Sequence, residues 1–197
     1  MSRPAASTDA ELAFVVPTLG AGSDQDEDVM QLLFFAGARL EQAMEVAGAE
    51  PLRARVLVVD GDTSGWQDAS ELLAPEVLPR LLFEAIPEPE VPGLATGCHK
   101  AAYDLLEYAR TRSFAELHCL DHGGVAYYVT QARRLGMDLL ATPIAVHVVG
   151  ATVFRAEADD RMLDRVEALA DDVLERGSIE RADALLVHDE RAWDWYT

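Results

Sequence analysis

The polar side chains best placed for chemistry stand where apolar runs of the sequence end. His147 lies near the end of the run PIAVHVVG, and Asp121, His122 and Gly123 follow the run FAELHCL. A neutral imidazole can exchange protons near neutral pH, and a carboxylate can accept hydrogen bonds from a ligand's hydroxyl groups. Two other interpretations stay open: His147 as a core residue bonded to backbone, and Asp121 as the cap of a following helix.

Gly20 and Gly22 follow the first apolar run of the chain, 12–16. Glycines at such a place let backbone N–H groups approach phosphate or sugar oxygens, which makes this loop a candidate binding element. The acidic DQDED that comes next would repel phosphate, and a plain tight turn is the alternative. The GxGxxG spacing of nicotinamide dinucleotide sites is absent here, which disfavours that class of protein.

Two further constellations do not predict a site. The cluster His118, Cys119, Asp121 and His122 suggests a metal, but alternate residues of a strand point to opposite faces, so His118 and Cys119 diverge. Cys98 beside His99 suggests a nucleophile and base, but neighbouring residues rarely face each other and no third group orients them. The sequence therefore predicts neither a metal nor a cofactor.

Unbroken apolar runs predict strands that are buried on both faces. These runs cover residues 12–16, 55–60, 114–120, 143–150 and 184–187. Stretches with helical spacing separate them, and they cover 26–48, 101–108, 123–136, 159–176 and 177–182, with the start of a last helix at 190–196. The segment 68–98 is rich in proline and fits either a short helix or a strand, followed by an irregular loop.

Alternation of strands and helices predicts an α/β, Rossmann-like fold with a mostly parallel sheet and helices on both faces. Residues 1–10 are small and polar and predict a flexible tail, while 11–197 form one domain. Ligands of such sheets bind beyond the carboxyl ends of the strands. The loops 17–25, 120–124 and 147–155 should therefore gather at one edge, with His147 partly open to a cleft that Gly20 or Gly22 also lines.

Composition narrows the partners of the chain. The 197 residues carry a formal net charge of −19 and a single lysine, so nucleic acid is an unsuitable partner. No segment approaches the roughly 18 apolar residues of a membrane span, and no signal peptide is evident. The two cysteines, Cys98 and Cys119, form no disulfide framework, which favours a cytoplasmic location.

Three stretches resemble retaining glycosyltransferases of the GT-B fold, of the glycogen-synthase type and of glycosyltransferase family four. The first, 114–137, has a strand ending in His and Asp before a Gly-led helix. The second, 142–154, has a strand with His near its end, and the third, 174–190, has an acidic helix, Ala-Asp and a strand. The chain departs from the family pattern at four places: Ala21 between the loop glycines, His122 for an aromatic, Val148 for Gly, and His188 for Ser.

The resemblance implies that the chain is the N-terminal, acceptor-side domain of a GT-B glycosyltransferase. His147 would face the donor sugar as the catalytic residue, and Gly20, Gly22, Asp121, His122 and Gly123 would bind substrate. The partners would be a nucleotide-sugar donor and a sugar acceptor. The donor-binding domain, which carries the cations for the diphosphate, would lie outside this chain, so the chain alone would be inactive.

A binding domain that kept the fold without the chemistry, with a sugar or a protein as its ligand, is the alternative. The sequence leaves the oligomeric state open, a homo-oligomer included. Trp193, Trp195 and Tyr196 crowd the C-terminus, and such aromatics usually cover apolar surface, either of their own domain or of a partner.

Overall fold

The computed structural model describes residues 11–16, 26–47, 54–59, 75, 78–87, 98–163, 165–188 and 190–196. Gly20, Gly22 and the predicted tail at 1–10 lie outside these residues. The predictions that concern them are therefore carried forward as predictions.

Six parallel strands form one sheet in the order β3-β2-β1-β4-β5-β6. The strands are β1 (Glu11–Val16), β2 (Ala54–Val58), β3 (Leu81–Ala85), β4 (Phe114–Leu120), β5 (Ile144–Val148) and β6 (Ala184–Val187). This order is that of the doubly wound Rossmann sheet. The predicted fold class, an α/β domain with a parallel sheet and helices on both faces, is confirmed.

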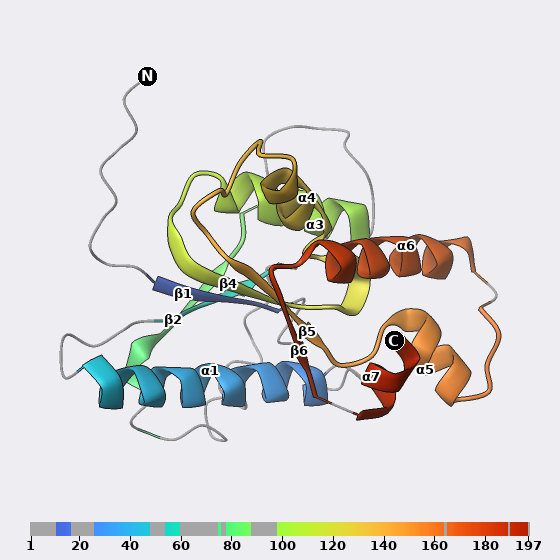
Figure 1. Cartoon of the computed structure of the whole chain (residues 1–197), viewed down its shortest axis with the longest axis horizontal. Coiled ribbons are helices and arrows are strands. Elements are labelled where there is room, and N and C mark those ends of the chain that lie inside the picture. Colours follow the sequence, from blue (N-terminus) through green and yellow to red (C-terminus); the bar gives the residue numbers. More distant parts are fainter. Residues whose placement is uncertain are drawn as a thin grey trace.

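Helices cover both faces of this sheet, as Figure 1 shows. The helix α1 (Asp26–Ala47) lies along one face, and α3 (Cys98–Ala109), α4 (Tyr127–Arg134) and α6 (Val166–Arg181) lie along the other. Shorter helical segments complete the described chain: η1 (Leu78–Arg80), η2 (His122–Gly124), α5 (Thr152–Ala158) and α7 (Glu190–Tyr196). None of the described helices combines the length and the apolar composition that crossing a membrane requires.

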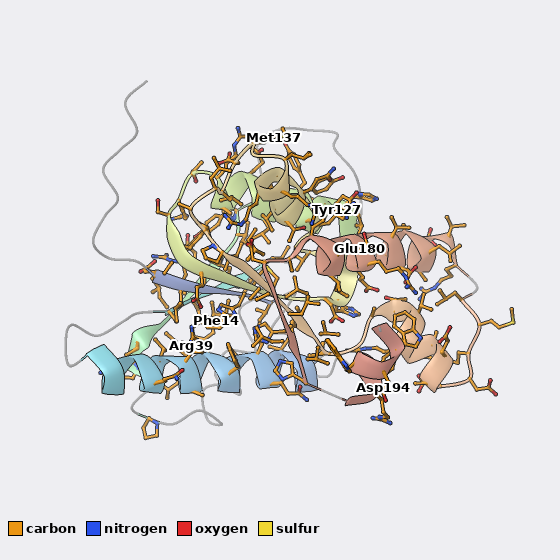
Figure 2. All side chains as sticks on the ribbon, viewed as in Figure 1. Phe14, Arg39, Tyr127, Met137, Glu180 and Asp194 are labelled. Carbon is orange, nitrogen blue, oxygen red and sulfur yellow. The ribbon has the colours of Figure 1, made fainter. Side chains whose placement is uncertain are left out.

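The alternation of side chains along each strand divides the core into two clusters. Along β1, Phe14 packs toward α1, while Val15 packs toward α3, α4 and α6. Figure 2 shows Phe14 between the sheet and α1, where its ring meets the edge of Phe35 with centroids 6.4 Å apart. Side chains on both faces of the central strands are therefore buried, as the unbroken apolar runs predict.

The same alternation along β4 sends a histidine and a cysteine to opposite faces of the sheet. Cys119 belongs to the cluster under α3 and α4, whereas the ring of His118 stacks on Phe14 on the side of α1. The predicted divergence of these two side chains is confirmed. Complete burial raises the pKa of the Cys119 thiol, so the thiol stays protonated.

Two predicted elements differ from the structure. The proline-rich segment, left open between helix and strand, contains η1 and the edge strand β3. The predicted helices 159–176 and 177–182 are instead the single helix α6, and the short helix α5 lies before them, partly in the predicted loop 147–155. Gly177, where the second of these helices was predicted to begin, lies inside α6, and a Cβ at this position would overlap the ring of Tyr127 on α4.

The aromatic C-terminus packs partly on its own domain. The indole N–H of Trp195 donates to Glu157 of α5 at 2.7 Å, and the ring contacts Phe154 edge-on. The guanidinium of Arg176 lies 4.6 Å from the indole centroid. Trp193 is 51% exposed. The prediction that these aromatics cover apolar surface is met by Trp195, and the covered surface belongs to this domain.

Candidate functional site

The carboxyl ends of β4, β5 and β6 meet at one edge of the sheet because the three strands are parallel neighbours. The segment η2 begins directly after β4, and α5 begins shortly after β5. Gly124 has a φ of +60°, and a Cβ there would overlap Leu174 of α6. The loop after β4 is thus pressed against α6, and this edge is the candidate site.

Asp121 holds the loop after β5 rather than a helix end. Its carboxylate accepts hydrogen bonds from the N–H groups of Val149 and Gly150, at 3.3 and 3.2 Å. Its side chain makes no cap bond to η2, so the capping interpretation is wrong. Burial raises the pKa of Asp121 to about 7, the nearby Glu175 adds to the rise, and the two N–H donors oppose it.

Glu175, which the sequence analysis did not single out, is the second buried carboxylate of this edge. It accepts hydrogen bonds from the Gly123 N–H at 2.8 Å, and from the Thr152 N–H and hydroxyl at 2.7 and 2.9 Å. Burial raises its pKa, and these donors limit the rise. Glu175 lies one helical turn before the buried Ile179, and this helical spacing was the signal that could have revealed it.

His147 is fully buried on the side of the sheet that faces α1. Its Nε2 lies 3.0 Å from Nδ1 of His118, and its Nδ1 lies 2.9 Å from Nε2 of His188. Burial lowers the pKa of His147 to about 3, with smaller contributions from the two other imidazoles. The prediction of partial access to a cleft is wrong, and so is the alternative of a bond to its own backbone, because both ring nitrogens contact histidines.

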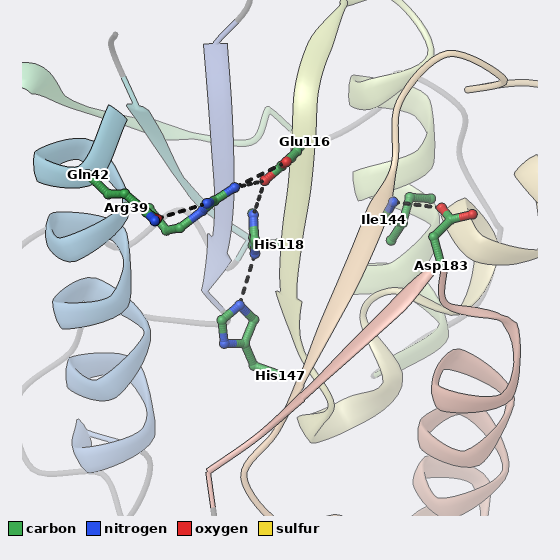
Figure 3. Close-up of polar contacts among 7 residues, drawn as sticks. All are labelled: Arg39, Gln42, Glu116, His118, Ile144, His147 and Asp183. Atoms are coloured by element: carbon green, nitrogen blue, oxygen red, sulfur yellow. Dashed lines mark hydrogen bonds and ion pairs between the residues drawn. The ribbon is translucent and has the colours of Figure 1, made fainter. Parts of the chain in front are cut away.

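His118 connects His147 to a carboxylate, as Figure 3 shows. Its Nε2 lies 3.1 Å from a carboxylate oxygen of Glu116, which also pairs with Arg39 of α1 at 3.0 Å. Glu116 and His118 share one face of β4 because they are two residues apart. That spacing was visible in the sequence, but the contact with His147 depends on β4 and β5 being neighbours.

A groove of about 470 Å³ opens beside these residues, between α1 and the strands β4 to β6. Its walls are mostly apolar, and His118, Glu116 and Arg39 are among the residues that line it. Asp183 stands at the start of β6, where its carboxylate accepts the Ile144 N–H at 2.8 Å. His147 is not among the lining residues of this groove, and it reaches the groove only through its contact with His118.

The predicted site residues thus divide between two places. Asp121 and Gly123 belong to the carboxyl edge, His122 is half-buried beside them, and His147 lies on the other side of β5. Arg155 of α5 donates from Nε to the Gly150 carbonyl at 2.7 Å. Among the described residues, no group of three or more His, Cys, Asp or Glu side chains is arranged to hold a metal ion.

No protein-family model and no curated protein matches this chain. Among solved structures it is similar to Phytolacca americana UGT2 complexed with UDP-2fluoro-glucose and pterostilbene, with 14% identity and a TM-score of 0.47 over 92% of this chain. It is also similar to apo UGT2 of the same organism, with 14% identity and a TM-score of 0.45 over 90% of this chain. The alignments cover 48% and 45% of those chains, so this chain spans about half their length.

Proposed function

We propose that this chain is the acceptor-side domain of a glycosyltransferase of the GT-B type. It would hold a sugar acceptor at the carboxyl edge while a second domain presents a nucleotide-sugar donor. The transfer would retain the anomeric configuration, as the resemblance implies, and the protein would work in the cytoplasm, which its cysteine pattern favours.

One observation carries the proposal: the three stretches that resemble glycosyltransferases bind one another at the carboxyl edge. Asp121 of the first stretch binds the backbone of Val149 and Gly150 in the second. Glu175 of the third binds Gly123 in the first and Thr152 in the second. Stretches far apart in the sequence thus build one preorganised edge, which is what a binding site on a Rossmann-like sheet requires.

Charge favours a donor site outside this chain. A diphosphate needs fixed cations, and the formal net charge here is −19. Arg155, beside the loop after β5, already donates to a backbone carbonyl, and both Asp121 and Glu175 are acidic. A second domain that supplies Arg or Lys would provide the missing positive charge.

Titration of the ¹⁵N-labelled chain with two ligand panels tests this proposal. We expect mono- and oligosaccharides to shift the amide signals around His122, Gly123 and Thr152. Nucleotide sugars should bind weakly, and calorimetry and an activity assay should find no transfer by the chain alone. The variant His122→Ala should weaken saccharide binding, whereas His99→Ala, a matched change on α3, should leave it unaltered.

Two outcomes would contradict the proposal. Turnover, or tight binding of a nucleotide sugar, by the 197 residues alone would mean that no second domain is needed. Saccharide shifts confined to residues far from the carboxyl edge would mean that this edge is not the acceptor site.

A second candidate, a non-catalytic sugar- or protein-binding domain, is favoured by how the polar groups are used. The carboxylates of Asp121 and Glu175 bind backbone groups, and both ring nitrogens of His147 contact other imidazoles. Such residues can be purely architectural. The same titration separates the two functions once a donor domain is supplied: saccharide binding without transfer supports the binding domain.

A further inference from the structure

The groove between α1 and the strands β4 to β6 has the volume of a small-molecule site. It measures about 470 Å³, and sites for small ligands commonly measure roughly 300–1,000 Å³ with mostly apolar walls. Figure 3 shows α1 and β6 on the two sides of this region, with the polar side chains of β4 between them. None of the residues placed at the carboxyl edge lines the groove, so the proposed function does not use it.

Two alanines form the floor of the groove. The strand register aligns one side chain of each strand in a row across the α1 side of the sheet: Val56, Phe14, His118, Ala145 and Ala184. Val56 and Phe14 are large and fully buried in the cluster that includes α1. At β5 and β6 the same row carries only methyl groups. The sheet therefore offers an apolar floor with open space above it, where the side chains under α1 fill that space.

Each carboxylate that lines the groove is already paired with a guanidinium. Glu116 accepts hydrogen bonds from Arg39 at 3.2 and 3.0 Å, and Asp183 accepts one from Arg133 at 2.5 Å. An ammonium ion in the groove would thus have no carboxylate to itself. A ligand carboxylate would lie beside Glu116, in a chain with a formal net charge of −19. Because a charge buried without a partner is costly, the groove favours a neutral ligand.

Arg39 is the polar group that can orient such a ligand. Its side chain lines the groove and is 38% exposed. The three hydrogen bonds that it donates to Glu116 and Gln42 do not use all the N–H groups of a guanidinium. The others can donate to a hydroxyl or carbonyl oxygen. His118 is less suitable, because its two ring nitrogens already contact Glu116 and His147.

We propose that this groove binds a small neutral amphipathic molecule, whose apolar body lies on Ala145 and Ala184 and whose oxygen accepts a hydrogen bond from Arg39. Leu186 and Phe35 also line the groove and extend the apolar contact. The site is a binding site, in which no covalent bond forms or breaks. It is independent of the proposed function, because it lies apart from the residues of the carboxyl edge.

Titration of the whole chain with three probes tests the charge of the ligand. The probes share an indole and a two-carbon side chain: tryptophol is neutral, tryptamine is a cation and indole-3-acetate is an anion. In a chain with ¹³C-methyl-labelled alanine, tryptophol should shift the signals of Ala145 and Ala184. Each charged probe should bind at least about tenfold more weakly. Equal or tighter binding of a charged probe, or shifts at neither methyl group, would overturn the proposal.

The variant Ala184→Leu tests whether the groove is the site. Ala184 lines the groove and is exposed on the edge strand β6, so the added atoms enter the groove rather than the core. We expect the affinity for tryptophol to fall about tenfold. Ala158→Leu, at an exposed alanine that ends α5, is the matched control and should leave the affinity unchanged.

Two results with Ala184→Leu would count against the proposal. One is an affinity for tryptophol equal to that of the control. The other is a dimer of the unmodified chain, seen on a sizing column, that Ala184→Leu dissociates, because a second copy would then occupy the groove.

A comparison of tryptophol with 3-ethylindole, which lacks the hydroxyl group, tests the role of Arg39. Arg39→Met should change the ratio of the two affinities about fivefold in favour of 3-ethylindole, because the hydroxyl loses its donor. Arg134→Met, at an exposed arginine of α4, is the control and should leave the ratio unchanged. Since the ratio is measured within one variant, a general loss of stability does not alter it. The same ratio in both variants would show that Arg39 does not orient the ligand.

Discussion

Two polar networks flank β4 and β5: one is built from carboxylates and the other from imidazoles. At the carboxyl edge, the carboxylates of Asp121 and Glu175 bind backbone N–H groups of three different loops or helix starts. On the side of α1, the imidazoles of His118, His147 and His188 contact one another. The first network shapes the backbone of the candidate site, whereas the second fixes the orientation of imidazole side chains.

The two networks also respond to acid in opposite directions. Burial raises the pKa of Asp121 and Glu175, so protonation favours the folded state. Burial lowers the pKa of His118 and His147, so protonation favours unfolding. Each network can therefore be disturbed and measured separately from the other.

The largest expected effect is that of Glu175→Ala. It leaves the N–H groups of Gly123 and Thr152 without their acceptor inside the protein, and it opens a cavity under α6. Because buried donors that lose a charged acceptor are costly, we expect the free energy of unfolding to fall by about 3–5 kcal/mol. Urea unfolding measures it, with Glu167→Gln on the exposed face of α6 as control. A loss equal to that of the control would show that Glu175 does not join the three stretches.

His147→Phe should destabilise the protein less, by about 2–3 kcal/mol. Phe fills a similar volume but leaves one nitrogen each of His118 and His188 without its ring partner. The same urea experiment applies, and the carboxyl-edge amides around Gly123 should keep their NMR shifts. Large shifts at those amides would mean that the two networks are coupled rather than separate.

The dependence of stability on pH should distinguish the networks by sign. The pKa of Asp121 is about 7 in the folded state, so its contribution to stability is complete below about pH 4 and is lost as the pH rises to 7. The pKa of His147 is about 3 in the folded state, so its contribution is complete above about pH 6.5 and is lost as the pH falls.

Compared with the unmodified chain, stability should therefore rise more steeply with pH in Asp121→Asn and less steeply in His147→Phe. Each difference is on the order of 1 kcal/mol per pH unit between about pH 4 and 6.5. Unfolding curves at several pH values measure the slopes. Two slopes that change in the same direction would show that the networks do not differ in this way.

The smallest expected effect is that of Thr152→Val, about 1 kcal/mol. It removes the hydroxyl that donates to Glu175 but keeps the backbone N–H at the start of α5. The matched control is Thr130→Val, which removes a hydroxyl bond to the Tyr127 carbonyl on α4. A loss as large as that of Glu175→Ala would mean that the hydroxyl, not the backbone, carries the network.

Sequence reasoning could predict the strands of this fold better than its site. Apolar runs located β4 and β6 with their observed bounds, because a strand buried on both faces has no polar interruption. The alternation also placed His118 and Cys119 on opposite faces. It did not give the strand order, and the contacts among His118, His147 and His188 exist only because β4, β5 and β6 are neighbours in that order.

Other parts of the site were beyond a residue-by-residue analysis. Asp121 resembles a helix cap because Asp is common before helices, but a loop from a different strand occupies its carboxylate instead. In the sequence, Glu175 looks like one more acid of a polar helix. The spacing between Glu175 and Ile179 indicates an inward face of α6, but the two loops that Glu175 binds come from other parts of the fold.

The buried thiol of Cys119 can report how often the central sheet opens. Its thiol lies in the core beneath α3 and α4, and burial keeps it protonated, so alkylating reagents should reach it only after the central strands separate. The rate of its labelling under native conditions would then report how often that opening occurs. Peptide mapping distinguishes this thiol from Cys98, so the lifetime of the central sheet can be followed without an added probe.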